Sequence, residues 1–336
     1  MQPVPIVTGW SLLPFAHFLR GIGAPVERWL AESEIPPIVL DLPDRPVPLH
    51  FALDFSERAA RAEGADSLGI DVGRHAAAEC LGAFGAALAR CPTLYDRIQS
   101  ACRRLSWVNN HQSIRLELDG PKAALHATFN CKGEPGLRHA EDFNLMLILE
   151  AIGRAAGPGW KPDAILLPGV RSLRFERDEL FQGVKIRYEA KAVAVIFSRK
   201  LLSRPLQQLP AGPARNLAPA AAQEAAPQAS DLVGSLESTV IALLPAGCPT
   251  IAELADLADT TPRTLQRRLA GSGTSVREVI DRARFRLADE YLRDTSISVT
   301  DIAFELGYGD STAFSRAFHR MTGVTPSTYR QQRYCV

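Results

Sequence analysis

The hydrophobic positions along the chain follow two different spacings. Before residue 110 and again after residue 231, apolar residues recur every three or four positions, which is the spacing of amphipathic helices. Between these regions lie stretches that alternate at every second position, such as Ile114, Leu116 and Leu118. That alternation is typical of strands with one buried face. The pattern therefore predicts an α+β N-terminal domain followed by an all-α C-terminal domain.

The elements of the N-terminal domain are predicted from these spacings. Helices are expected at 12–19, from 26 onward, and at 49–61, 81–88, 93–107 and 140–156, with strands at 114–118, 125–129, 164–167, 184–188 and 192–197. The pair Asp119-Gly120 separates the first two strands, and an Asp-Gly pair is typical of a tight hairpin turn. The expected domain therefore combines helices with antiparallel strands.

The C-terminal domain contains the same two-helix arrangement twice, at about 250–270 and 298–321. Each copy has a short helix with an Ile-Ala pair, a polar turn and a second helix that carries arginine. The second helices are expected to bury Leu265, Leu269, Phe314 and Phe318. Two copies in tandem indicate two helix-turn-helix motifs, a structure whose second helix enters the major groove of DNA.

Capping signals support both copies. Thr250 and Glu253 have the spacing of a capping box, in which two side chains satisfy N–H groups at the start of a helix. Thr261 followed by Pro262 also marks a helix start, because proline at the first helical position lacks an N–H that would have no helical partner. The corresponding signals of the second copy are Ser298, Asp301, Gly307 and Asp310.

The polar side chains of the two second helices are the candidate DNA contacts. Residues 261–270 contain three arginines and no acidic residue, and 311–321 contain two arginines and one histidine, again without an acidic residue. Arginine, glutamine and serine form hydrogen bonds with base edges and phosphates. The predicted contact residues are Thr261, Arg263, Gln266, Arg267, Arg268, Ser311, Thr312, Ser315, Arg316 and Arg320.

A long helix is predicted between the two copies, over 274–294, with an apolar stripe that includes Val276, Ile280 and Leu287. A helix of about 20 residues is about 30 Å long, and successive turns of one DNA face lie about 34 Å apart. The two second helices are therefore expected to enter successive major grooves. The charged residues of the long helix are interpreted mostly as solvated surface.

Residues 232–333 resemble the DNA-binding domain of the AraC/XylS family of bacterial transcription regulators. The matching stretches are Thr-Pro-Arg-Thr-Leu-Gln-Arg-Arg-Leu at 261–269, Arg-Leu-Ala-Asp-Glu-Tyr-Leu at 286–292, Asp-Ile-Ala-Phe-Glu-Leu-Gly-Tyr at 301–308 and Gly-Val-Thr-Pro-Ser-Thr-Tyr-Arg at 323–330. The resemblance implies sequence-specific binding to double-stranded promoter DNA. It also implies contact with RNA polymerase when the regulator activates transcription.

A second resemblance covers most of residues 1–210. The stretches 81–96 and 197–205 are similar to the N-terminal domain of an AraC-family branch that includes regulators of ornithine and arginine use and of mycobacterial virulence. That domain, called arabinose-binding-like by homology, implies a regulatory role through a small effector or dimerisation. Residues 211–230 are rich in alanine and proline, so we expect a linker there. Residues 1–210 are then expected to form a homodimer, and 231–336 to bind DNA.

Composition argues against several other classes of protein. The net charge is only +1, yet residues 261–336 carry 12 arginines against 8 acidic residues, a local surplus that suits DNA binding. The six cysteines include no Cys-x-x-Cys pair, which argues against a metal site or a disulfide framework. The chain shows no apolar run of bilayer length and no signal peptide. A cytoplasmic protein without a metal or cofactor is expected.

An enzyme with an appended AraC-type module is the alternative interpretation. The sequence contains no Gly-x-Ser-x-Gly, His-Glu-x-x-His or Walker motif that would support it. A purely architectural DNA binder is disfavoured because both copies specify groove-reading side chains. Four lone residues that could line a pocket, but are more often core or surface, are Trp107, His111, His126 and Trp160. We therefore expect a transcription regulator without enzymatic activity, with an effector that the sequence does not identify.

Overall fold

The computed structural model describes residues 3–131, 133–171, 175, 178–206, 228–293 and 297–334. The chain divides into two compact units. One, the mixed unit, consists of residues 7–45 and 49–228, and the other, the helical unit, consists of residues 1–6, 46–48 and 229–336. Most of the linker predicted at 211–230 lies outside the described residues.

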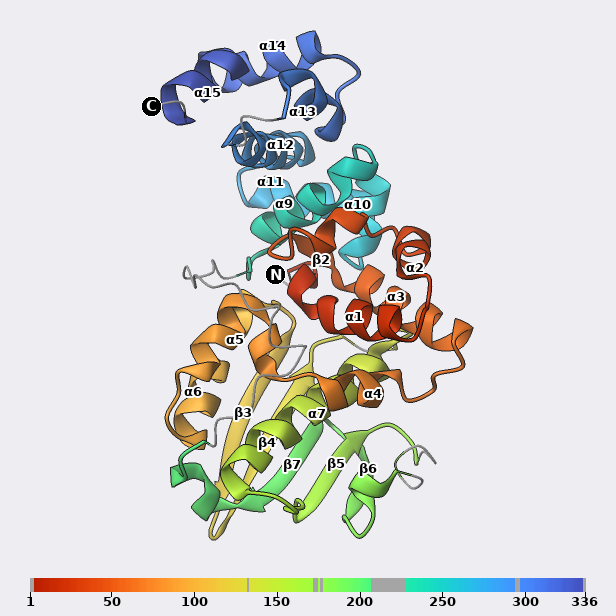
Figure 1. Cartoon of the computed structure of the whole chain (residues 1–336). Coiled ribbons are helices and arrows are strands. Elements are labelled where there is room, and N and C mark those ends of the chain that lie inside the picture. The colour runs from red at the N-terminus through yellow and green to blue at the C-terminus, as the bar shows by residue number, and fades with distance from the viewer. Residues whose placement is uncertain are drawn as a thin grey trace. The chain divides into compact units, whose positions relative to one another are not determined.

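The mixed unit is built from helices and one five-stranded sheet (Figure 1). Its helices are α1 (Leu13–Gly21), α2 (Val26–Glu32), α3 (Leu49–Ala62), α4 (Leu68–His75), α5 (Gly82–Ala89), α6 (Leu94–Arg104) and α7 (Leu137–Ala156). The sheet has the order β3-β4-β7-β5-β6, formed by β3 (Gln112–Asp119), β4 (Lys122–Phe129), β5 (Ala164–Pro168), β6 (Ile186–Ala190) and β7 (Val193–Ser198). Adjacent strands are antiparallel except β5 and β6, which are parallel. The predicted α+β class is confirmed.

The hairpin of β3 and β4 forms where the sequence predicts it. Asp119 pairs with Lys122 at its end, and Gly120 has a φ of 53°, a left-handed conformation that glycine adopts without strain. Along β4, Leu125 and Ala127 alternate with more exposed residues and are buried. These buried side chains give the sheet one apolar face, against which a helix can pack.

Helix α7 covers that face of the sheet (Figure 1). Its buried Leu145, Ile148 and Ile152 share one hydrophobic cluster with Val193 and Val195 of β7. Burial of leucine and isoleucine side chains contributes roughly 1.5–3 kcal/mol each. This cluster therefore holds the long helix to the sheet.

Helix α4 is an element that the spacing of apolar residues did not predict. It packs against α7 at Gly69, where an added Cβ would lie 2.1 Å from the backbone oxygen of His139. The short strands β1 (Ile6–Thr8) and β2 (Pro46–Pro48) were also not predicted. Each has three residues, too few for a periodic pattern to be recognised.

The helical unit contains α9 (Leu232–Leu243), α10 (Ile251–Leu257), α11 (Pro262–Gly271), α12 (Val276–Arg293), α13 (Val299–Glu305), α14 (Ser311–Thr322) and α15 (Pro326–Tyr334). One hydrophobic cluster runs through all of the helices from α9 to α14. It also includes Val4, whose N–H donates a 2.9 Å hydrogen bond to Ser235 Oγ of α9. The N-terminal segment is thus part of this core.

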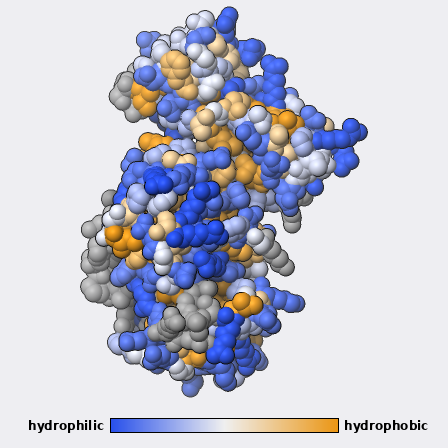
Figure 2. All heavy atoms as spheres, turned by 90° about the vertical axis from the view of Figure 1, so that its right-hand side faces the viewer, coloured by the Kyte–Doolittle hydropathy of each residue, from blue (hydrophilic) through white to orange (hydrophobic). Residues whose placement is uncertain are grey.

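The surface is polar over most of the face shown in Figure 2, with hydrophobic residues in scattered patches. No helix in the described part of the chain is long and apolar enough to cross a membrane.

Candidate nucleic-acid interface

The first helix-turn-helix motif begins with the predicted capping box. The backbone N–H of Thr250 donates to Glu253 Oε2 at 2.6 Å, and the N–H of Glu253 donates to Thr250 Oγ1 at 3.3 Å. The backbone N–H and the hydroxyl of Thr250 both donate to the Glu253 carboxylate and lower its pKa, because they stabilise its ionised form. Helix α10 is therefore fixed at its start by its own side chains.

The second helix of this motif, α11, has one buried face and one exposed face. Thr261 caps it by accepting a 3.3 Å hydrogen bond from the N–H of Thr264, and Pro262 occupies the first turn, as predicted. Leu265 and Leu269 are buried, which confirms the prediction for both. The remaining side chains of the helix are consequently directed away from the core.

The second motif repeats this arrangement. Ser298 accepts a hydrogen bond from the N–H of Asp301 at 3.1 Å, and Asp310 accepts one from the N–H of Ala313 at 2.7 Å. Between these caps Gly307 adopts a φ of 71°, the left-handed conformation expected of the turn. Phe314 and Phe318 are each 2% exposed and pack edge to face at a centroid distance of 5.6 Å. The capping and burial predictions for α14 are confirmed.

The candidate DNA contacts lie on the outer faces of α11 and α14. Thr261, Arg263, Gln266, Arg267, Thr312, Arg316 and Arg320 are exposed, while Arg268, Ser311 and Ser315 are half-buried. Among the described residues, Arg263, Arg267, Arg316 and Arg320 have no ion-pair or hydrogen-bond partner for their side chains. The Thr261 hydroxyl, in contrast, is engaged in capping the helix. Four guanidinium groups thus remain available to an external acceptor.

Three arginines of α12, between the motifs, are bound within the unit, whereas the exposed Arg277 of the same helix has no ion-pair or hydrogen-bond partner among the described residues. Arg282 and Arg286 lie 3.7 and 3.0 Å from the two carboxylate oxygens of Glu237 in α9. Arg284 donates to the backbone oxygen of Leu306 at 3.1 Å, and its guanidinium lies 4.6 Å from the centre of the Tyr308 ring. Arg282 and Arg286 are exposed, as expected of solvated surface, and also link α12 to α9, whereas Arg284 is half-buried and links α12 to the end of α13.

Sequence reasoning missed these links because their acceptors are distant in sequence or are backbone atoms. Glu237 lies 49 positions before Arg286. Arg284 donates to the backbone oxygen of Leu306, and because every residue has such an oxygen, the residue type does not identify the acceptor. A weak signal was present, since Arg282 and Arg286 are four positions apart and therefore share one face of the helix. Together the links give both motifs a common scaffold.

The described residues contain no cluster of three or more His, Cys, Asp or Glu side chains that could hold a metal ion. Cys80, Cys91, Cys102, Cys131 and Cys248 are not in disulfides. Burial raises the pKa of the Cys80 thiol to about 12 and that of Cys131 to about 11, so neither forms a thiolate readily. Burial thus makes Cys80 and Cys131 poor nucleophiles.

Two helix-turn-helix motifs on one helical core define a DNA-binding regulator, and comparison with known proteins agrees. Residues 254–332 match the helix-turn-helix domain family, and residues 23–206 match the arabinose-binding N-terminal domain of AraC transcription regulators. The chain belongs to the AraC family of transcription regulators. It is a DNA-binding transcriptional regulator with an N-terminal regulatory domain.

Two relatives that match over most of their length support this assignment. The chain is 30% identical to an uncharacterized HTH-type transcriptional regulator of Mycobacterium tuberculosis over 92% of both chains. It is 29% identical to the ornithine utilization regulator of Pseudomonas aeruginosa, over 89% of this chain and 88% of that one. The crystal structure of the transcriptional regulator CdpR from Pseudomonas aeruginosa is 22% identical, with a TM-score of 0.39 over 91% of this chain and 96% of CdpR.

Proposed function

We propose that α11 and α14 bind successive major grooves of promoter DNA. The observation that supports this most strongly is the contrast between the arginines. Those on α11 and α14 have no partner among the described residues, while Arg282, Arg284 and Arg286 of the intervening helix are bound within the unit. A guanidinium fork matches the paired acceptors of guanine or a phosphate.

The length of α12 suits this arrangement. Its 18 residues span about 27 Å, which is comparable with the roughly 34 Å between successive turns of one DNA face. The predicted contacts are Thr261, Arg263, Gln266, Arg267 and Arg268 in the first motif, with Ser311, Thr312, Ser315, Arg316 and Arg320 in the second. Within this set Thr261 acts through the helix start that it caps.

Base reading by these helices can be tested with single substitutions in the full chain. Arg267→Ala and Arg316→Ala should each weaken binding to the cognate operator by about 1–3 kcal/mol, with a smaller loss on random duplex. Fluorescence anisotropy with both duplexes would measure the two losses. Arg286→Ala is the matched control, since it removes the same side chain from a position paired with Glu237. An equal loss on both duplexes would instead assign Arg267 and Arg316 to phosphate contacts.

We further propose that the chain acts as a cytoplasmic homodimer through residues 1–210, contacts RNA polymerase where it activates, and has no enzymatic activity. Operators of bacterial regulators commonly mirror the symmetry of a dimer, and the named relatives are regulators. Sedimentation of the full chain at micromolar concentration should give the mass of a dimer. A monomer under these conditions would contradict the dimer proposal.

Control of DNA binding is proposed to come from an effector bound in the mixed unit. An effector changes DNA affinity only if it favours one arrangement of the protein over another, and such coupling is typically about 1–3 kcal/mol. The chemistry of that effector depends on what the mixed unit can accommodate.

A further inference from the structure

The mixed unit contains a cavity of about 150 Å³ between its helices and the β3–β4 hairpin. Side chains from α1, α3, α5, α6, α7 and both hairpin strands line it. The cavity therefore lies inside a single unit, and its shape depends on that unit alone. An apolar cavity of roughly this volume can admit a molecule the size of benzene.

Aromatic rings form much of the cavity wall. Phe15, Phe55, Phe84, Phe129 and Phe143 all line it, and the rings of Phe15 and Phe143 lie 5.2 Å apart between centroids. Most of the remaining wall is aliphatic. A polyhydroxylated molecule such as a sugar would leave several hydroxyl groups without partners against these side chains. Each such group would lose its hydrogen bonds to water without a replacement, which disfavours binding.

A chain of amide side chains supplies the polar part of the wall. Asn109 Nδ2 donates to Gln112 Oε1 at 3.1 Å, and Gln112 Nε2 donates to Asn144 Oδ1 at 2.8 Å. The N–H of Gln112 also donates to Asn109 Oδ1 at 3.0 Å, and Asn144 Nδ2 donates to the backbone oxygen of Ala140 at 2.9 Å. Because each amide has two N–H donors and two acceptor lone pairs, each keeps one donor and one lone pair beyond these contacts. His111, one of the four residues singled out from the sequence, also lines the cavity and is 4% exposed. One end of the cavity can thus satisfy a hydroxyl or carbonyl group.

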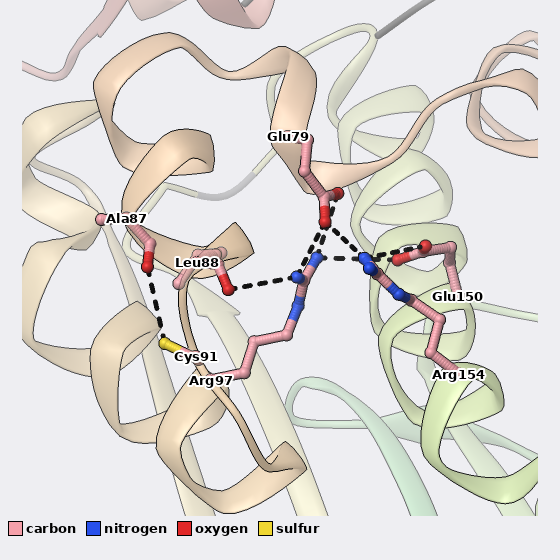
Figure 3. Close-up of polar contacts among 7 residues, drawn as sticks. All are labelled: Glu79, Ala87, Leu88, Cys91, Arg97, Glu150 and Arg154. Atoms are coloured by element: carbon pink, nitrogen blue, oxygen red, sulfur yellow. Dashed lines mark hydrogen bonds and ion pairs between the residues drawn. The ribbon is translucent and has the colours of Figure 1, made fainter. Parts of the chain in front are cut away.

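Arg97 is the charged residue among the described side chains that line the cavity, and its charge is already balanced (Figure 3). Its guanidinium donates to Glu79 at 2.9 and 3.2 Å and lies 3.8 Å from Glu150. Arg154 pairs with the same two carboxylates. Two arginines and two glutamates leave no excess positive charge, so an anionic ligand would gain little from this cluster.

We propose that the cavity binds a small, uncharged, mostly aromatic molecule with one polar group directed at the amide chain. The inference deepens the proposed function, since this molecule would be the effector. The phenylalanines would contact the apolar body of this molecule, and the amide chain would bind its polar group. Because the charges of the two arginines are balanced by two glutamates, the molecule is expected to be uncharged.

Binding can be measured on the full chain without DNA. Saturation-transfer NMR and thermal shift should detect benzyl alcohol, with benzoate and L-arabinose at least tenfold weaker. Ala151→Leu, which adds bulk to the lining, should weaken benzyl alcohol binding at least tenfold. Gly153→Leu on the same helix is the matched control, because a Cβ there meets no atom within 4 Å.

A second variant tests the polar end of the cavity. Asn144→Leu should weaken benzyl alcohol more than toluene, whereas Ala151→Leu should weaken both. Tighter binding of arabinose than of benzyl alcohol, or aromatic binding unchanged in both variants, would overturn the proposal. Because these measurements contain no DNA, their failure would leave the groove-binding proposal intact, and failure of the arginine substitutions would leave this one intact.

Discussion

This chain contains arginines of two contrasting kinds: some are buried and paired with glutamates, and others are exposed without a described partner. A guanidinium carries five N–H donors, so one that is buried must find acceptors inside the protein. Arg97, 2% exposed, meets this need with Glu79 and Glu150. Arg267 and Arg316 are exposed and have no described partner. The sequence identified the second kind as binding candidates, but it could not identify the first because the partners come from other helices.

Glu79 is expected to be necessary for the stability of the mixed unit. Burial raises its pKa, but hydrogen bonds and charges from Arg97 and Arg154 more than offset this and bring the pKa to about 2. Glu79→Gln would leave two buried guanidiniums with a single carboxylate. It should lower the free energy of unfolding at pH 7 by about 3–5 kcal/mol, measured by urea denaturation. Glu63→Gln, at an exposed position, should have no measurable effect.

The low pKa of Glu79 also predicts that its contribution to stability depends on pH. A carboxyl whose pKa falls from 4.5 to about 2 on folding stabilises the protein above pH 4.5, and this contribution is lost as the pH falls toward 2. The difference between the native chain and Glu79→Gln should therefore shrink between pH 5 and pH 3. A difference that stayed constant over this range would show that folding does not shift the pKa of Glu79, and one that grew as the pH fell would show that Glu79 is protonated in the folded state.

At the scale of helices and strands, predictions succeeded where the local sequence determines the structure. The caps at Thr250, Thr261 and Asp310 require only residues three positions away, and each forms as expected. Helix α4 was missed because tertiary contacts stabilise it, through glycines that allow close approach to α7. The cavity was missed for a similar reason, since its wall comes from segments that are distant in sequence. Of that wall, His111 alone was singled out, and only as a lone residue.

The cap of α14 should control how well the second reading helix forms. Asp310→Ala removes the acceptor of the 2.7 Å hydrogen bond from Ala313 N–H, and should lower stability by about 0.5–2 kcal/mol. Hydrogen–deuterium exchange should then accelerate in α14 more than in α11. Asp310→Asn retains the acceptor and should differ from the native chain by only a few tenths of a kcal/mol. Equal exchange in Asp310→Ala and the native chain would show that the core alone fixes this helix.

At the scale of the whole molecule, the helical unit is not one continuous stretch of sequence. It includes short segments at 1–6 and 46–48 in addition to 229–336. Val4 and Ser235 are 231 positions apart and both are almost completely buried. Neither hydrophobic spacing nor motif could predict this contact, because Val4 lies in a short segment before β1 that is too short to carry a periodic signal. Any fragment that begins near residue 228 therefore lacks part of the core of its own unit.

Weakening the packing of the Val4 side chain in this core should loosen α9 even though the substitution lies at the other end of the chain. Val4→Ala deletes two buried methyl groups and should cost about 1–2 kcal/mol. Hydrogen–deuterium exchange of the full chain should become faster in α9, while the sheet of the mixed unit keeps its protection. Val170→Ala, at a site that is 78% exposed, is the control and should change neither. A fragment of residues 228–336 should show the same faster exchange in α9, because it lacks Val4 entirely. If α9 were equally protected in Val4→Ala, in the fragment and in the native chain, the N-terminal segment would have no part in stabilising the DNA-binding helices.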